Sequence, residues 1–201
     1  MKMVFLFILS NCLFFSNSSN PELLLNSESQ ICLSENESNL AEMINSYRIE
    51  NGLTPIPLSS SLTQVAKEHV SDLVINKPYD DENNCNPHSW SEEGKWKACC
   101  YNSGKDGECM WNKPRELTYY DADGYEIVMG EFNSQHLTKE VSAESAIEAW
   151  KESQRHNAII LNQDIWKKTD WNAMGIGIYQ GFAAVWFGRE LDPSGSPQTC
   201  P

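Results

Sequence analysis

The amino-acid sequence predicts an α+β fold in which helices pack against an antiparallel sheet. Apolar residues recur at helical spacing in two stretches of the first half of the chain and in one stretch of the second half. Near the C-terminus, two short apolar runs flank a tight turn, as in a β-hairpin. Between the early helices and the hairpin lies a Cys- and Trp-rich segment with little periodicity, residues 80–124. This segment is too long for an ordinary connection and predicts a disulfide-braced insert.

The N-terminus has the features of a secretory signal peptide over residues 1–18. Lys2 supplies a positive charge, and Met3 to Phe15 is mostly apolar. A buried N-terminal helix is the alternative, although no amphipathic stretch follows it. Cys12 also ends a weak bacterial lipobox, so a lipoprotein anchored through Cys12 is a second alternative. We therefore expect a secreted protein, either extracellular or periplasmic.

The predicted elements follow in order after a polar N-terminal tail, residues 19–38. A helix over 40–50, capped by Ser38 or Asn39, is followed by a second helix over 60–76. The remaining expected elements are a short strand over 125–129, a helix over 142–154, a helical or turn segment over 159–166, a hairpin of strands 173–179 and 182–187, and a tail over 189–201.

The cysteine count predicts disulfides. Of seven Cys, one lies in the signal peptide, and an even number remains for up to three bridges in an exported protein. The pairing stays open at this point, although a bridge between Cys32 and Cys200 near the two ends is conceivable. A zinc-thiolate site is disfavoured because no C-x-x-C motif is present. The six candidates for disulfides are Cys32, Cys85, Cys99, Cys100, Cys109 and Cys200.

Charge and length exclude several classes of function. The 201 residues carry a net charge of −13, from 28 acidic and 15 basic side chains. Phosphate binding needs a basic face, so nucleic acid is not expected as a partner. No internal stretch is apolar for long enough to cross a bilayer, so an integral membrane protein is not expected either.

Several motifs in order resemble a known family. The chain is similar to the CAP superfamily, which comprises the cysteine-rich secretory, antigen 5 and pathogenesis-related 1 proteins, and most of all to its bacterial SCP-like branch. The resemblance covers about residues 39–188, and residues 89–124 form an insert that the general family pattern does not include. The motifs are LAEMINSYR (40–48), NGL (51–53), PL (57–58), Leu62-x-x-Val65-Ala66-x-x-His69, Trp150-x-x-Ser153-x-x-His156, MGIGI (174–178) and WFG (186–188).

The resemblance implies an α-β-α sandwich with a large central cleft, lined in many members by two His and two Glu that can bind a divalent metal. The two His map to His88 and His156. The first Glu maps to Glu126 or, less well, to Glu131, because the Asn of the family's G-E-N motif is missing at both. Glu152 is a candidate for the second Glu, out of register by one residue. Zinc is the metal that this set of ligands favours.

The function expected from these observations is a secreted binding or interaction module whose His/Glu cleft holds a divalent metal. Its ligand is an unidentified lipid, glycan or protein. A metal-dependent, protease-like hydrolase and a small lipid- or sterol-binding protein are the alternatives. The hydrolase alternative lacks a nucleophile, since no G-x-S-x-G motif occurs and the cysteines after the signal peptide are expected to be paired. The H-E-x-x-H motif of metalloproteases is also absent. We interpret His69 as a packing or surface residue and His136 as a solvated one.

Overall fold

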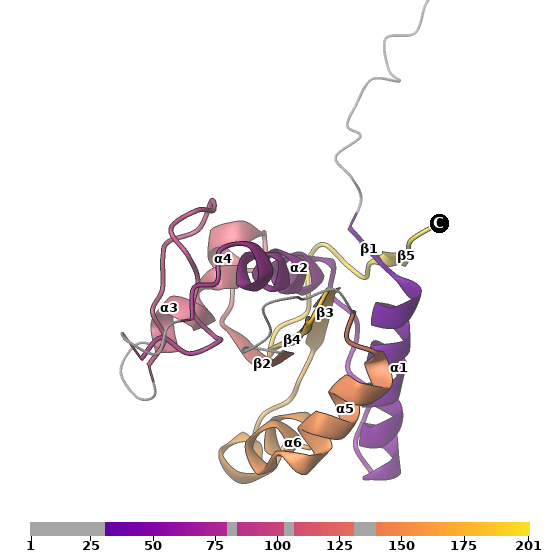
Figure 1. Ribbon diagram of the computed structural model, residues 1–201. Coiled ribbons are helices and arrows are strands. Elements are labelled where there is room, and N and C mark those ends of the chain that lie inside the picture. The colour runs from indigo at the N-terminus through magenta and orange to yellow at the C-terminus, as the bar shows by residue number, and fades with distance from the viewer. Residues whose placement is uncertain (1–30, 80–83, 103–106, 131–139) are drawn as a thin grey trace, which may run out of the picture.

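A computed structural model describes residues 31–79, 84–102, 107–130 and 140–201 (Figure 1). The predicted signal peptide, Cys12, Glu131 and His136 lie outside these residues. The helices are α1 (Glu35–Glu50), α2 (Ser60–Ile75), α3 (Gly107–Trp111), α4 (Lys113–Leu117), α5 (Ala143–Glu152), α6 (Gln154–Ile160) and a 3₁₀ turn η1 (Asp164–Trp166). The strands are β1 (Cys32–Leu33), β2 (Gly124–Gly130), β3 (Ala173–Tyr179), β4 (Phe182–Gly188) and β5 (Gln198–Thr199).

The central sheet is antiparallel and runs in the order β2-β4-β3. The hairpin predicted at Gln180-Gly181 joins β3 to β4, and Tyr179 pairs with Phe182 across it. The strand predicted over 125–129 becomes β2 and pairs with the other side of β4, where Glu126 lies opposite Trp186. The predicted fold class and its antiparallel sheet are therefore confirmed.

Two layers of helices cover the sheet, as Figure 1 shows. Side chains of a strand alternate between its two faces, so each strand contributes to two cores. Ile127, Ile176 and Val185 belong to the core that contains α1, α5 and α6. Val128 and Ala184 pack with the C-terminal half of α2 on the opposite face. Glu126 precedes Val128 by two residues and so faces α2 as well.

Helix α1 begins at Glu35, and the start predicted at residue 40 is wrong. Ser34 accepts a hydrogen bond from the backbone N–H of Glu37 at 3.2 Å, and the Glu37 carboxylate accepts one from the backbone of Ser34 at 2.8 Å. This reciprocal capping box is a stronger start signal than the Ser38 or Asn39 that we chose. The part of the predicted polar tail from Cys32 onward lies in β1 and α1.

The helix predicted over 142–154 is α5, which ends at Glu152, and a further helix, α6, begins at Gln154. Ser153 adopts an extended conformation, which ends α5 and begins α6. The same residue lies inside the Trp150-x-x-Ser153-x-x-His156 motif, so the break separates Trp150, which is fully buried, from His156. The change of direction therefore sets where His156 lies relative to the core.

Helix α2 packs closely on β3 because Gly175 has no side chain. A Cβ atom at this position would overlap the backbone of Leu62 and Thr63 in α2. We expect Gly175→Ala to lower the free energy of unfolding by about 3 kcal/mol, because the helix must move away from the sheet. Urea denaturation followed by circular dichroism measures this value. A loss below about 0.5 kcal/mol would show that α2 has freedom to shift.

The ends of the described chain are tied together. Strands β1 and β5 pair in parallel, and a disulfide joins Cys32 to Cys200. The other bridges are Cys99–Cys109, within the insert of residues 89–124, and Cys85–Cys100, which joins the insert to the loop before it. All six predicted cysteines are therefore paired. Among the described residues, no helix is long and apolar enough to cross a membrane.

Candidate functional site

The centre of the candidate site is a buried carboxylate on β2. The side chain of Glu126 is fully shielded from solvent, and each of its oxygens faces a histidine. Oε1 contacts Nδ1 of His69, and Oε2 lies 2.7 Å from Nδ1 of His88. Glu126 therefore links a helix residue to a loop residue through one carboxylate group.

His69 lies on the face of α2 that packs against the sheet, and its side chain has no exposed surface. Its ring stacks on Trp90, with 4.3 Å between the ring centroids and 9° between the planes. Its second nitrogen, Nε2, lies 3.1 Å from the backbone carbonyl oxygen of Ser89. Of the two interpretations from the sequence, packing or surface, the surface position is wrong, because His69 is buried. His69 is also part of the site, which its sequence position did not indicate.

Both ring nitrogens of His69 face oxygen acceptors. A neutral imidazole carries one N–H, so only the imidazolium form donates to both. Burial alone would raise the pKa of Glu126, but the charge of His69 and the hydrogen bonds from both histidines outweigh it and lower that pKa. The carboxyl is therefore ionised. With an oxygen acceptor at each of its ring nitrogens, His69 has the contacts of an imidazolium that forms a buried ion pair with Glu126.

His88 differs from His69 in being partly exposed, with 21% of its side chain accessible. Because Nδ1–H donates to Glu126, the neutral ring carries its lone pair on Nε2. A carboxylate that holds one imidazole nitrogen in this way fixes the tautomer and makes the other nitrogen more basic. His88 can thus present a defined acceptor nitrogen to a ligand.

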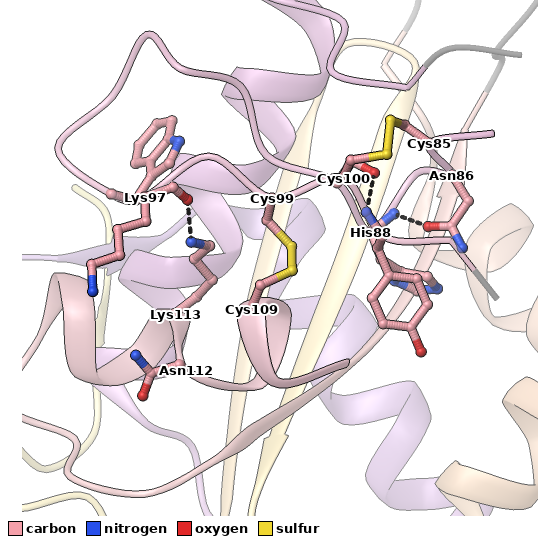
Figure 2. The surroundings of a disulfide bond; sticks show 12 residues. Cys85, Asn86, His88, Lys97, Cys99, Cys100, Cys109, Asn112 and Lys113 are labelled. Atoms are coloured by element: carbon pink, nitrogen blue, oxygen red, sulfur yellow. Dashed lines mark hydrogen bonds between the residues drawn. A yellow bond between two sulfur atoms is a disulfide. The ribbon is translucent and has the colours of Figure 1, made fainter. Parts of the chain in front are cut away.

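The loop that carries His88 is braced by the insert (Figure 2). Its backbone N–H donates to Oδ1 of Asn86 at 2.9 Å, and the Cys85–Cys100 bridge lies beside it. Backbone hydrogen bonds between Trp90 and Cys99 close the next turn, and Cys99 is itself bonded to Cys109. The two adjacent cysteines therefore anchor two different parts of the insert next to the site.

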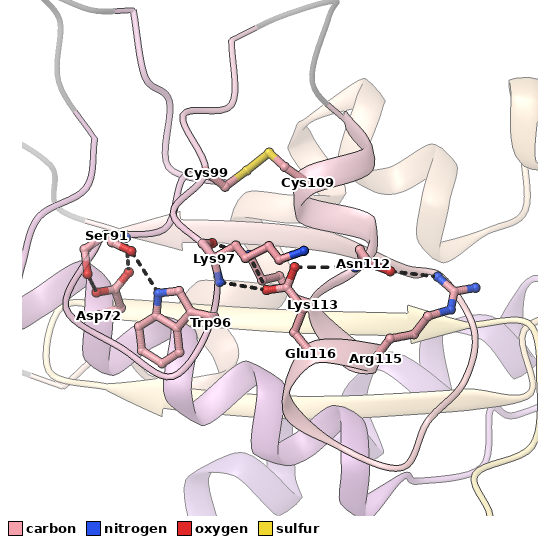
Figure 3. Close-up of polar contacts among 10 residues, drawn as sticks. All are labelled: Asp72, Ser91, Trp96, Lys97, Cys99, Cys109, Asn112, Lys113, Arg115 and Glu116. Carbon is pink, nitrogen blue, oxygen red and sulfur yellow. Dashed lines mark hydrogen bonds and ion pairs between the residues drawn. A yellow bond between two sulfur atoms is a disulfide. The ribbon is translucent and has the colours of Figure 1, made fainter.

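A second set of polar contacts holds the outer part of the insert (Figure 3). Lys113 is fully buried and donates to the Glu116 carboxylate at 2.7 Å and to the carbonyl oxygen of Lys97. Burial lowers the pKa of Lys113, although the hydrogen bond and charge of Glu116 oppose this shift. Asp72 of α2 accepts two hydrogen bonds from Ser91, one from its backbone and one from its hydroxyl. These contacts fix the insert to α2.

His156 lies at the start of α6. Burial lowers the pKa of His156, a positive charge on His88 would lower it further, and Glu126 acts in the opposite direction. His156 is therefore neutral at pH 7 and has a lone pair available. The structure joins Glu126 to His88 by a hydrogen bond, and the pKa of His156 responds to both residues. Glu152, by contrast, is exposed at the end of α5.

The donor set differs from the one expected for a metal. Both oxygens of Glu126 are already engaged by histidines, so this carboxylate positions His88 from behind. In the described part of the chain, no cluster of three or more His, Cys, Asp or Glu side chains is arranged to hold a metal ion. Two imidazoles, His88 and His156, remain as ligands with the right chemistry for zinc.

Comparisons with known proteins match both the sequence and the fold. The family model described as "CAP: Cysteine-rich secretory protein family" matches residues 41–183. The structure is similar to an extracellular protein containing an SCP domain from Bacillus anthracis, with a TM-score of 0.52 and 15% identity. That match covers 77% of this chain and 40% of the Bacillus protein, so the chain spans less than half of that protein's length.

Two further solved structures are similar to this chain with slightly lower TM-scores. An outer surface protein from Borrelia burgdorferi gives a TM-score of 0.49 at 16% identity, over 78% of this chain and 93% of its own. A cysteine-rich secretory protein from Staphylococcus aureus gives a TM-score of 0.48 at 16% identity, over 82% of this chain and 41% of its own. Among curated protein sequences, none matches significantly.

The family model spans most of the chain, from α1 to the first residues of β4. It includes His69, His88, Glu126 and His156, the four residues on which the candidate site depends. The α+β architecture with its antiparallel sheet agrees with the resemblance that the sequence motifs indicated. The chain belongs to the CAP family, the cysteine-rich secretory protein family.

Proposed function

We propose that this CAP-domain protein is an exported binding module, in which His88 and His156 present imidazole nitrogens to an extracellular ligand. The observation that carries the proposal is the hydrogen bond from His88 to the buried Glu126 at 2.7 Å. It orients the partly exposed ring and directs the lone pair of Nε2 away from the carboxylate. Glu126 in turn contacts His69, so a buried residue supports the carboxylate that orients His88.

Zinc is the divalent metal that we propose for this site. Nε2 of His88 and a ring nitrogen of His156 would hold it, and water or the ligand would complete its coordination. With two protein ligands in place of the three or four usual in zinc proteins, binding should be weak and easily shared with a ligand. A bound zinc ion would supply a Lewis acid that attracts carboxylate or carbonyl oxygens of a partner.

A hydrolase that uses Glu126 as its base is less well supported. The carboxylate is fully buried, and both of its oxygens contact histidines, so it does not reach a substrate or its attacking water. A base would have to be His88 or His156, acting without a nucleophilic Ser or Cys, since all six cysteines after the signal peptide form disulfides. Binding without chemistry is the simpler role.

Export is supported by the same disulfides, because such bonds persist in oxidising compartments and are rare in the cytosol. A protein retained at the membrane by a lipid on Cys12 and a protein released in free form are both compatible with a family of secreted proteins.

Mass spectrometry of the exported protein distinguishes these two alternatives. A chain that begins after residue 18 without added mass indicates release, and a diacylglyceryl adduct on Cys12 indicates anchoring.

Calorimetric titration of zinc into the disulfide-bonded protein tests the proposed site. We expect saturable binding at pH 7 that is lost in His88→Ala and in His156→Ala, because each removes one of the two protein ligands. Glu152→Gln is the matched control, since this carboxylate is exposed on the neighbouring helix and should leave the affinity unchanged. Undiminished zinc binding in both histidine variants, or none in the wild type, would contradict the proposed metal site.

A further inference from the structure

A concave region lies beside the connection that follows η1, and no histidine lines it. It is a cavity of about 440 Å³. Its lining combines the end of α1 and the turn after it with residues that lead into β3. The polar and charged members of the lining that matter here are Arg48, Thr54, Lys167, Thr169, Asp170 and Asn172.

Arg48 is the innermost charged group of this cavity, with an exposed fraction of only 3%. Nε donates to the carbonyl oxygen of Thr54 at 3.0 Å. Nη1 donates to the carbonyl oxygen of Ile160, at the end of α6, and to Oδ1 of Asn162 at 2.6 Å. These three acceptors are neutral, and they hold the plane of the guanidinium group in place.

The charge of Arg48 has no counterion within the described part of the chain. None of the ion pairs found there includes Arg48. Burial lowers the pKa of Arg48 to about 10, so the group stays charged at neutral pH. A buried cation satisfied only by neutral oxygens is an unfavourable arrangement in most proteins, because ionised groups are usually paired when buried.

One nitrogen of Arg48 is also free to bind. Nη2 forms no hydrogen bond with any described residue, and the Arg48 side chain has no polar contact there beyond those of Nε and Nη1. Nη2 is not among the fully enclosed polar atoms that lack partners, so it retains access to solvent. Since Arg48 lines the cavity, its unused N–H groups are available there.

The mouth of the cavity adds charge of both signs. Lys167 is an exposed lining residue with a flexible ammonium group, and Asp170 is the one carboxylate of the lining. Two cations against one anion leave the cavity locally positive in a chain whose net charge is −13. An acidic protein that retains a positive cavity around an unpaired buried Arg has a local preference for negative ligands.

We propose that this cavity binds a small oxyanion, a phosphate or carboxylate group, through Nη2 of Arg48 and Nζ of Lys167. Guanidinium and ammonium groups form charge-assisted hydrogen bonds with such oxygens. The oxyanion neutralises Arg48 and lies between α1 and the connection to β3. The site uses none of the histidines or Glu126, so it stands independently of the binding function proposed above.

The test follows the Nε–Hε resonance of Arg48 by NMR while inorganic phosphate is added at pH 7. A parallel titration with acetate distinguishes a phosphate from a carboxylate preference, and sodium chloride at equal ionic strength reports screening alone. We expect a saturable shift with phosphate, acetate or both, and no saturable shift with chloride. Arg48 itself is left unchanged, because its removal would also break the contacts that hold α6.

Three exposed positions provide the variants. Lys167→Gln should weaken anion binding about fivefold to tenfold, since it removes one charge-assisted contact at a solvent-exposed site. Lys168→Gln is the matched control, because it changes the net charge equally but this residue does not line the cavity. Asp170→Asn should strengthen binding about threefold by removing the like charge.

Two results would overturn the proposal. The first is a wild-type Arg48 resonance that responds to phosphate and acetate only as it responds to chloride. The second is an equal loss of affinity in Lys167→Gln and Lys168→Gln, which would reduce the effect to overall charge. Neither result depends on zinc or on the histidines.

Discussion

Glu126→Gln is expected to lower the free energy of unfolding by about 3–5 kcal/mol, the usual cost of removing one partner from a buried ion pair. The side chain keeps its shape but loses its charge. The amide oxygen can accept one hydrogen bond, and the amide nitrogen would meet an N–H of the other histidine. His69 would then be a buried cation without its carboxylate. Chemical denaturation of both proteins at pH 7 measures the difference.

The same substitution should weaken zinc binding about tenfold to a hundredfold, because groups that orient a ligating histidine typically have effects of this size. The affinity is measured where the variant remains folded. Glu152→Gln again serves as the control, for stability as well as for binding. A Glu126→Gln protein as stable as the wild type would show that the contacts to the two histidines contribute little.

The ion pair also predicts how stability depends on pH. The pKa of Glu126 is lower in the folded state than its ordinary value of 4.5. As the pH falls below 4.5, the Glu126 carboxylate is therefore protonated in the unfolded chain before it is protonated in the folded protein. The stabilisation that the ionised Glu126 gives the folded state is lost as the pH falls through the folded pKa. We expect the wild type to lose stability more steeply than Glu126→Gln between about pH 5 and pH 3. Parallel slopes would contradict an ionised Glu126.

Removal of the Cys32–Cys200 bridge is expected to have the other large effect on stability. This bond closes a loop with a sequence separation of 168, so its loss frees a long chain in the unfolded state. The loop-entropy model gives about 5 kcal/mol for a Cys32→Ser, Cys200→Ser double variant, as an upper value. Guanidinium denaturation under non-reducing conditions measures it.

The Cys99–Cys109 bridge provides the comparison, since its sequence separation is only 10. The same model gives about 3 kcal/mol for its removal by a double Ser variant. If removal of the Cys99–Cys109 bridge lowers the free energy of unfolding more than removal of the Cys32–Cys200 bridge does, packing around Cys99 contributes more to stability than the chain-entropy effect. In that case the parallel pairing of β1 and β5 holds the two ends without the covalent bond.

The elements that the sequence predicted well are those with a clear period. The second helix, the strand over 125–129 and the hairpin appear within one or two residues of their expected bounds, because alternation and helical spacing depend on local burial alone. The start of α1 was missed because a capping box is recognised from two side chains, Ser34 and Glu37, and the apolar pattern begins only later.

Motif similarity indicates His88, Glu126 and His156 as site residues, and the structure joins the first two by a hydrogen bond. The sequence does not single out His69, because one polar residue on an apolar helix face carries little information by itself. Glu126 offers an indirect signal, since a charged residue within an apolar strand needs a buried partner of opposite charge. The pairing of the cysteines, by contrast, depends on the path of the insert, which no local pattern encodes.

The junction of Cys32 with Cys200 has a mechanical consequence. A tether attached before Cys32 and another attached after Cys200 would leave the domain at the same point, one beside the other. A pulling force applied between them would pass through the sulfur–sulfur bond and leave the sheet unloaded. The domain would keep its shape under tension until that bond is reduced, and a reductant would then expose the whole chain to the load.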